Sequence, residues 1–377
     1  MDYILNKYIS NNLNYWKNIN KNKKIMLNII SKYRLPIVHI KIKNKKVTII
    51  KKFNTKGNKK LEKAIYFLED IVNLYPQLDI DLFLNIKDTL TDEKINAYNI
   101  NNLSKIKDNP DNYLWGVSKS DKNYIRIVDS DIIDKYNFSF PIFCFERHRK
   151  MHGILFPTFG ADNDNFTRSP SIDKFSWEKK DIDKSIFRGK NICCDKSNLD
   201  KVRLVNFSSN FSNDTDFKFC STKKHPLWGK YIISPSHLKF FQNLGIINKD
   251  KKINKFRENF SMDNFVSFDY IFRHKYIVTV GSAKNRKWYL SNSCILEYKF
   301  KNKEYFHEDI FNDMEDIVFF DENNYFDKML QLKQNNYELS KKIVKNRKEK
   351  FMNYLHYPNL VKWYGKFLLE YQKLFNN

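Results

Sequence analysis

Glycine and proline are scarce in this chain of 377 residues, which contains only nine of each. That scarcity excludes collagen-like and low-complexity proteins, which need many of both. No apolar run approaches about 20 residues, so no membrane-spanning helix is expected. The N-terminus, MDYILNKYISNNLNYW, lacks the basic segment and apolar core of a secretory signal. We therefore expect a globular cytoplasmic protein, and the length suits two domains better than one.

The few cysteines do not form a recognisable framework. There are five, an odd number, and none is placed in a C-x-x-C pair. Without a secretory signal, a reducing compartment is the simplest interpretation. His148 and His152 have the spacing of two helical metal ligands, but no third ligand follows nearby. We expect no metal and no other cofactor, with an Asp-x-Asp metal–nucleotide site at Asp129 and Asp131 as a minor alternative.

Acidic residues are too few to balance the basic ones, and the formal net charge is +24. One explanation is an anionic partner such as a nucleotide, a phospholipid or a nucleic acid. The other is coding bias, because Lys, Asn and Ile are the residues that an AT-rich genome over-supplies. Clustering indicates binding better than total charge does, and the lysines are scattered. The basic run VKNRKEKF (344–351) fits a membrane-surface or nucleic-acid patch, or simply a solvated helix face.

The hydrophobic pattern of the first half predicts an α/β domain. Residues 59–75 have apolar positions at helical spacing, and residues 80–88 form a nearly continuous apolar run typical of a buried parallel strand. A helix that leads into such a strand is the alternation of a doubly wound sheet. Residues 37–53 alternate apolar and basic side chains around Asn44, which predicts a β-hairpin. Residues 1–33 are expected to be helical.

The second half repeats the alternation of strands and helices. The turn-rich stretch 160–171 is the expected linker between two domains. The tail from residue 325 is expected to be helical for about 45 residues, with a break near Pro358. Buried strands are expected within 140–149, 184–189, 267–282, 294–300 and 316–321.

Two polar segments follow predicted strands and are candidates for a site. Asp88 ends the strand FLNIKD, where open α/β sheets place their ligands, so its carboxylate could act as a general base. A helix N-cap or a solvated turn would explain the same aspartate. Arg188, Gly189 and Lys190 end another strand and could hold phosphate oxygens. The alternative is a structural arginine paired with a carboxylate.

A third candidate segment is VTVGSAKNRKWYL (278–290). It contains a strand, a glycine turn, three basic residues and the start of a helix. A helix N-terminus has free N–H groups and a partial positive charge, which suit a diphosphate. The segment is neither a GxGxxG motif nor a P-loop, and a basic solvated turn would give the same pattern.

Taken in order, these segments resemble glycosyltransferase family 90, which includes capsule-associated, lipopolysaccharide-modifying and Rumi-like protein O-glucosyltransferase enzymes. The stretch YPQLDIDLFLNIKD is similar to the family's strand ending in Asn-x-x-Asp. FSWEKKDIDKSIFRGK is similar to its Trp followed by an aromatic-Arg-Gly. The resemblance runs from about residue 37 to the C-terminus. Its other segments are FPIFCFERHRKMHGILFP, HKYIVTVGSAKNRKWYLSNSCIL and the closing helices from residue 341.

The resemblance implies a GT-B-like fold, in which two Rossmann-like domains face a cleft and the last helix crosses back to the first domain. Its domains would be an acceptor-side domain (1–170, with a helical extension over 1–33), a nucleotide-sugar domain (171–350) and returning helices (351–377). The reaction would be inverting, metal-independent transfer of a hexose or pentose, with glucose or xylose favoured. The UDP-sugar is then a substrate, and the acceptor is a hydroxyl of a glycan, glycolipid or protein.

The resemblance also implies roles for particular residues. Asp88 would be the catalytic base. The donor diphosphate would lie against Arg188, Gly189, Lys190, Gly281, Ser282, Lys284 and Arg286, with either Lys284 or Arg286 as the cation of the turn. The cleft or acceptor side would be lined by Phe145, Arg147, His148 and Trp177.

The sequence departs from the family pattern in several places. Lys190 replaces the usual Ser or Thr after Arg-Gly, and NDMEDIVFF lacks the family's Pro and His before the next strand. Secreted members have signal peptides and paired cysteines, and this chain has neither. Two other functions therefore stay open, a basic nucleic-acid-binding protein and a catalytically inactive glycan-binding relative. Peripheral membrane contact is a further possibility, and nucleic acid is the less favoured partner.

Overall fold

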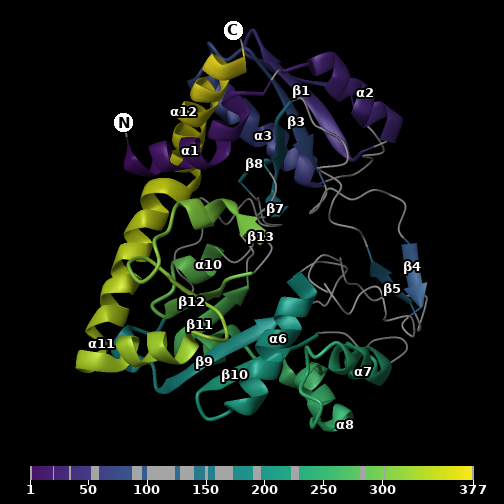
Figure 1. Ribbon diagram of the computed structural model, residues 1–377. Coiled ribbons are helices and arrows are strands. Elements are labelled where there is room, and N and C mark those ends of the chain that lie inside the picture. The colour runs from purple at the N-terminus through teal and green to yellow at the C-terminus, as the bar shows by residue number, and fades with distance from the viewer. Residues whose placement is uncertain are drawn as a thin grey trace.

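The protein forms two α/β units, and the helical C-terminal tail runs along one side of both (Figure 1). The computed structural model describes residues 2–19, 21–33, 35–51, 59–86, 96–99, 124–127, 140–148, 152–157, 173–189, 197–221, 229–280, 286–300 and 303–375. The predicted linker, residues 160–171, lies outside these ranges, so the domain boundaries stay predictions.

The first unit contains a mixed sheet of five strands in the order β2-β1-β3-β6-β8. Strand β1 is antiparallel to both β2 and β3, whereas β3, β6 and β8 are parallel. The predicted hairpin is confirmed, because Asn44 and Lys45 both have positive φ (50° and 61°), as a two-residue hairpin turn requires. The strands are β1 (Ile37–Lys43), β2 (Lys46–Lys51), β3 (Ile80–Asn85), β6 (Ile142–Cys144) and β8 (Ile154–Leu155).

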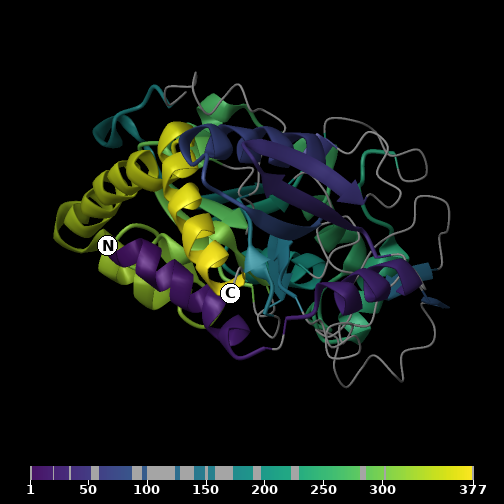
Figure 2. The same ribbon diagram turned by 90° about the horizontal axis from the view of Figure 1, so that it is seen from above.

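Helices cover this sheet, including one from the far end of the chain. The predicted helical segment 1–33 consists of two helices, and the helix expected over 59–75 is present. The C-terminal helix packs against the first and third of them (Figure 2). Gly365 permits this contact, since a Cβ there would lie 2.2 Å from the Tyr75 ring. The four helices are α1 (Tyr3–Lys17), α2 (Lys23–Tyr33), α3 (Lys59–Leu74) and α12 (Tyr357–Phe375).

The second unit has a five-stranded sheet in the order β10-β9-β11-β12-β14, and every pairing in it is parallel. Alternation along β11 sends Ile277 to one core and Tyr276 and Val278 to the other. The core that contains Ile277 is continuous with the core of the first unit. The strands are β9 (Ile182–Gly189), β10 (Thr215–Phe219), β11 (His274–Val280), β12 (Cys294–Tyr298) and β14 (Val318–Phe320).

Short elements complete this unit and connect it to the first. Its helices are α6 (Ser197–Asn210), α7 (Pro235–Asn243), α8 (Ile253–Phe256), α9 (Phe268–Phe272) and α10 (Arg286–Tyr289). Single 3₁₀ turns occur at Trp177–Lys179, Arg257–Asn259, Met262–Asn264 and Phe306–Asp309. Two-stranded ribbons are formed by β4 (Asn96–Asn99) with β5 (Tyr124–Ile127), and by β7 (Glu146–His148) with β13 (Lys303–Tyr305).

The predicted helical tail is confirmed, with two interruptions. Helix α11 (Tyr325–Lys350) is kinked where Asn335, Asn336 and Tyr337 have φ of 49°, 53° and 63°, a left-handed backbone that is unfavourable for these side chains. A π turn over 351–355 then leads to His356, which is extended, so the break falls just before Pro358. No helix in the described ranges is both long enough and apolar enough to cross a bilayer.

This architecture confirms the expected fold class. Both units are α/β, each has parallel strands at its centre, and the last helix returns to the first unit. One expected strand is wrong in detail. The apolar run over 140–149 is not a single strand, because the chain bends at Phe145 and its polar second half, β7, leaves the sheet to pair with β13.

Candidate functional site

A two-stranded ribbon holds the carboxyl ends of the two sheets together. Strand β7 follows β6 after a single residue, and β13 follows β12 after a short turn. The two pair antiparallel, with Glu304 opposite Arg147 and Tyr305 opposite Glu146. Each member of the ribbon therefore emerges from the carboxyl end of a parallel strand in a different unit. Open α/β sheets bind ligands at this edge, so the candidate site lies where the two edges meet.

Arg147 is the main side-chain link within this ribbon. Its Nε donates to Glu304 Oε2 at 2.8 Å, and its Nη1 donates to the Gly153 carbonyl at 2.8 Å and to Asn12 Oδ1 at 3.1 Å. Burial lowers the pKa of Arg147, but the carboxylate of Glu304 outweighs it, so the net shift is upward. Arg147 thus lies at the junction and holds the two units together. Contact with an acceptor stays a prediction.

A buried carboxylate adds a second link between the units. Asp309 Oδ1 accepts from Asn11 Nδ2 at 2.7 Å, and its Oδ2 accepts from Asn12 Nδ2 at 3.2 Å. Both asparagines belong to α1, whereas Asp309 ends the 3₁₀ turn that follows β13. Burial raises the pKa of Asp309, and the two amides oppose that shift. The junction is therefore held by polar contacts as well as by the shared core.

Arg188 is at the end of β9, as the sequence predicts, and its guanidinium group binds protein atoms. Nε donates to the Asn264 carbonyl at 2.9 Å, Nη1 donates to the carbonyls of Phe187 and Asp216 at 2.9 and 2.7 Å, and Nη2 pairs with the Asp216 carboxylate. Burial would raise the pKa of Asp216, but the bond from Arg188 more than offsets this and lowers it. These contacts match the structural alternative for Arg188, and its role toward a diphosphate stays a prediction.

Gly189 also has a structural reason to be glycine. A Cβ at this position would lie 2.8 Å from the rings of Phe187 and Phe219, closer than van der Waals contact allows. These two rings pack edge to face in the second core, with their centroids 5.7 Å apart. The absence of a side chain therefore lets β9 and its neighbour β10 bury both aromatics.

We predict that Arg188→Ala lowers the free energy of unfolding by about 2–4 kcal/mol, because Asp216 and three carbonyls lose their donor. Urea denaturation measures the change. Arg273→Ala is the matched control, since Arg273 pairs with Asp181 at the exposed surface, where such a pair contributes less than about 1 kcal/mol. Equal losses in the two variants would remove the structural role from Arg188.

The other predicted residues differ in where the structure places them. Trp177, expected in the cleft, is buried in the second core and packs against Tyr276 and Tyr337. Phe145 is buried at the bend between β6 and β7, with the Lys60 ammonium 5.5 Å from its ring centre. His148 belongs to β7, so its expected helical spacing to His152 does not occur. Arg286 opens α10, and the remaining candidates, Asp88, Lys190, Gly281, Ser282 and Lys284, lie outside the described residues.

Sequence reasoning missed Glu297, a fully buried carboxylate one residue from the end of β12. Its Oε1 is 2.5 Å from His307 Nε2, and its Oε2 accepts from Tyr289 Oη at 2.9 Å and from Thr279 Oγ1 at 3.4 Å. The available signal is a single glutamate inside the apolar strand CILEY. A charge at such a position needs buried partners, and here the partners come from three other elements.

Arg347 was also missed, because it lies in the basic run 344–351. Its guanidinium is fully buried and donates to the carbonyls of Tyr289, Ser293 and Ser291 at 2.9, 2.7 and 2.5 Å. Burial lowers its pKa to about 10, so it stays charged at neutral pH. The prediction of a surface patch or a solvated helix face is therefore wrong at this residue, which ties α11 to the chain between α10 and β12.

The same chain segment is held from its other side. Asp173 Oδ2 accepts from the backbone N–H of Asn292 at 2.7 Å and from Lys180 Nζ at 2.9 Å. The Asn292 side chain donates to the Phe175 carbonyl at 2.8 Å. The Ser-Asn-Ser stretch, 291–293, is consequently a buried polar junction. It joins the start of the second unit to the helix that leaves it.

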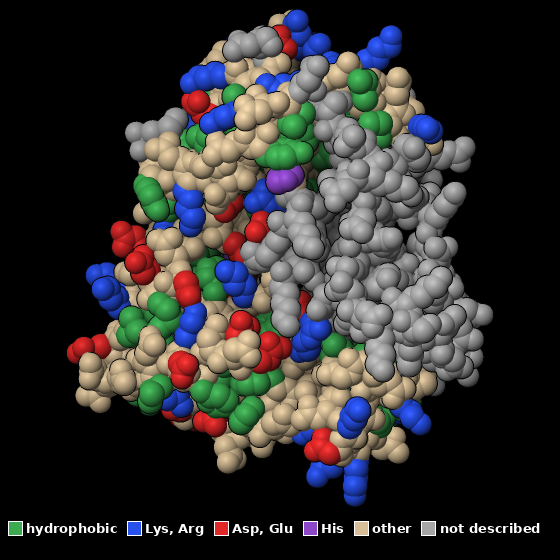
Figure 3. All heavy atoms as spheres, in the orientation of Figure 1, with side chains coloured by type: hydrophobic (Ala, Val, Ile, Leu, Met, Phe, Trp, Pro, Cys, Tyr) green, Lys and Arg blue, Asp and Glu red, His purple; other side chains and the backbone are tan. Residues whose placement is uncertain are grey.

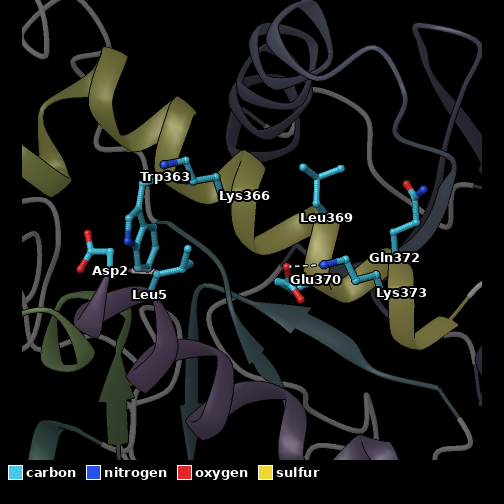
Figure 4. Close-up of a pocket in the computed structure, with 8 residues that line it drawn as sticks. All are labelled: Asp2, Leu5, Trp363, Lys366, Leu369, Glu370, Gln372 and Lys373. Atoms are coloured by element: carbon cyan, nitrogen blue, oxygen red, sulfur yellow. Dashed lines mark hydrogen bonds and ion pairs between the residues drawn. The ribbon is translucent and has the colours of Figure 1, made fainter.

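Described pockets lie away from the strand ends. One of about 310 Å³ lies between α1 and α12, with Leu5, Trp363 and Leu369 as its apolar walls (Figure 4). Another of about 390 Å³ adjoins the kink in α11. On the face shown in Figure 3, basic and acidic side chains are interspersed over the described residues. That mixture gives no support to a basic nucleic-acid surface on this face.

No protein-family profile matches the chain, and no curated protein is similar enough in sequence to count as a relative. The C-terminal domain of a glycosyl transferase group 1 family protein, LpcC, from Francisella tularensis matches with a TM-score of 0.30 and 15% identity over 52% of this chain and 98% of that one. TarM matches with a TM-score of 0.33 and 14% identity over 63% and 41%.

A glycosyltransferase from Rickettsia africae ESF-5 matches with a TM-score of 0.34 and 14% identity over 66% of this chain and 61% of that one. All three of these solved structures are, or by their titles belong to, proteins described as glycosyltransferases or as TarM. The matches span less than two thirds of TarM and of the rickettsial protein. Likenesses this low do not assign the chain to a family.

Proposed function

We propose that this protein is a glycosyltransferase that moves a sugar from a UDP-sugar to a hydroxyl group of a glycan, glycolipid or protein. The observation that carries the proposal is the β7–β13 ribbon, which brings the carboxyl ends of two parallel sheets to one place. Each of the three candidate segments follows a strand at this edge, namely β3, β9 or β11. The sequence resemblance adds the residue types that such a transfer requires.

The proposed reaction is an inverting displacement. The acceptor hydroxyl attacks the anomeric carbon from the face opposite the diphosphate, and a base removes its proton as the new bond forms. Asp88, which follows β3, is proposed as that base. Negative charge develops on the departing UDP, and cations with backbone N–H groups would stabilise it. Glucose or xylose is the proposed sugar, by resemblance alone.

The donor diphosphate is proposed to bind beside β11, at residues 281–286. Gly281, Ser282 and either Lys284 or Arg286 supply a turn and a cation there. Arg188 remains a candidate ligand at the neighbouring strand end, but it would have to exchange its contact with Asp216 for phosphate. A guanidinium fork binds phosphate oxygens better than an ammonium group does, so such an exchange is chemically reasonable.

We expect UDP to raise the melting temperature of the protein by several degrees. A ligand at 100 times its Kd stabilises the native state by about 2.7 kcal/mol if it does not bind the unfolded chain. Differential scanning fluorimetry with UDP, GDP and duplex DNA measures the effect, followed by a screen for hydrolysis of UDP-sugars. A rise with DNA alone would favour the nucleic-acid-binding alternative. No response to UDP and no UDP-sugar hydrolysis would overturn the proposal.

A further inference from the structure

We infer that Glu297 is a positioning residue, which fixes the chain on both sides of the turn between β11 and α10. The inference rests on the proposed function, because that turn is the proposed donor site. Thr279 is the next-to-last residue of β11, and Tyr289 is the last residue of α10. Both donate to the same oxygen of Glu297. One buried carboxylate therefore joins the entrance and the exit of the turn.

The contacts to Tyr289 are stronger than those to Thr279. The Tyr289 hydroxyl lies 2.9 Å from Glu297 Oε2, whereas Thr279 Oγ1 lies at 3.4 Å. The backbone of Tyr289 is also held, because its carbonyl accepts from Arg347 Nε at 2.9 Å. The side chain and the main chain of the same residue are thus anchored on two charged groups. A hydrogen bond to a charged group contributes more than one between neutral groups.

The second oxygen of Glu297 extends the network toward the first unit. His307 Nε2 lies 2.5 Å from Oε1, and His307 belongs to the same 3₁₀ turn as Asp309. Asp309 in turn accepts from Asn11 and Asn12 of α1. Glu297 therefore places the turn after β11 relative to the junction as well as within its own sheet. A donor bound at that turn would keep a defined position relative to the base on the other unit.

A pair of tyrosine variants tests this inference. Tyr289→Phe removes one hydroxyl bond to Glu297. Tyr298→Phe is the matched control, because Tyr298 is equally buried (1% exposed, like Tyr289) and donates to another carboxylate, Glu322, away from the turn. Both variants lose one buried hydroxyl–carboxylate bond, so similar losses of global stability are expected. They differ only in which segment the lost bond holds.

Hydrogen–deuterium exchange of the folded protein gives the first readout and needs no ligand. In Tyr289→Phe we expect the peptide covering residues 279–290 to exchange about tenfold faster, as local opening becomes easier. In Tyr298→Phe the same peptide should exchange as in the wild type. Equal exchange in the two variants would overturn the inference. Glu297→Gln provides a second test, and it too should accelerate exchange of this peptide.

Binding of UDP and uridine gives the second readout. Tyr289→Phe should weaken UDP binding about tenfold, the equivalent of 1.4 kcal/mol, and should leave uridine binding unchanged, because only UDP carries the diphosphate. The control should bind both as the wild type does. If the wild type binds no UDP while the exchange difference persists, Glu297 still positions the turn and the proposed function fails instead. An equal loss for UDP and uridine would contradict the assignment to the diphosphate.

Discussion

Replacing Asp88 by asparagine is expected to lower the rate of sugar transfer by a factor of about 10²–10⁴. An amide is nearly the same size as a carboxylate but cannot accept the hydroxyl proton. Affinity for UDP should stay within about twofold of the wild type, because a base on the acceptor side does not touch the diphosphate. Single-turnover transfer assays with the UDP-sugar identified by the hydrolysis screen measure the first effect, and calorimetric titration with UDP measures the second.

The same strand offers a matched control for this substitution. Asp81 belongs to β3, whose last residue, Asn85, precedes Asp88 by three positions. The Asp81 carboxylate is bound by His39 Nε2 and Lys23 Nζ, each at 2.6 Å, and although burial acts to raise its pKa, these two partners lower it to about 2. Asp81→Asn should therefore reduce stability and leave the transfer rate of the folded protein intact. Transfer that survives in Asp88→Asn would place the base elsewhere.

Local patterns in the sequence were sufficient to predict most of the regular structure. Alternation around Asn44 indicated the β1–β2 hairpin, since two residues of positive φ are what a tight turn needs and asparagine tolerates that backbone. Continuous apolar runs located the central strands of both sheets, because strands buried on both faces have no polar positions. Helical spacing followed by Pro358 located the tail and its break. Each of these signals lies within a few residues of the feature that it predicts.

The sites that the sequence did not reveal depend on partners far away in the chain. Arg147 and Glu304 are 157 positions apart, and the short polar strands that carry them have no apolar periodicity. Arg188 has the residue type that a phosphate ligand needs, and nothing in its own strand indicates that Asp216 will bind it. Residue type and local spacing thus locate the edge of the sheet where the candidate site lies. They do not decide which groups at that edge are already engaged by the protein.

Replacing Arg347 by methionine is expected to lower the free energy of unfolding by about 3–5 kcal/mol. Methionine keeps much of the length of the side chain and fills part of its space. It has no N–H group, so the carbonyls of Tyr289, Ser291 and Ser293 would be left without the donor that Arg347 provides. Each buried carbonyl that loses its partner costs about 1–3 kcal/mol, and relief from burying the Arg347 charge offsets part of that cost. Urea denaturation measures the net change.

Lys345→Met on the same helix is the control that isolates burial from charge. Lys345 is exposed and lies two residues from Arg347, so both variants lose one positive charge from the same basic run and gain the same side chain. An exposed substitution of this kind changes stability by no more than about 0.5 kcal/mol. A loss confined to Arg347→Met would show that the arginine acts through the three carbonyls of the segment between α10 and β12. Similar small losses in both would return the whole run 344–351 to the solvated helix face that its sequence alone suggests.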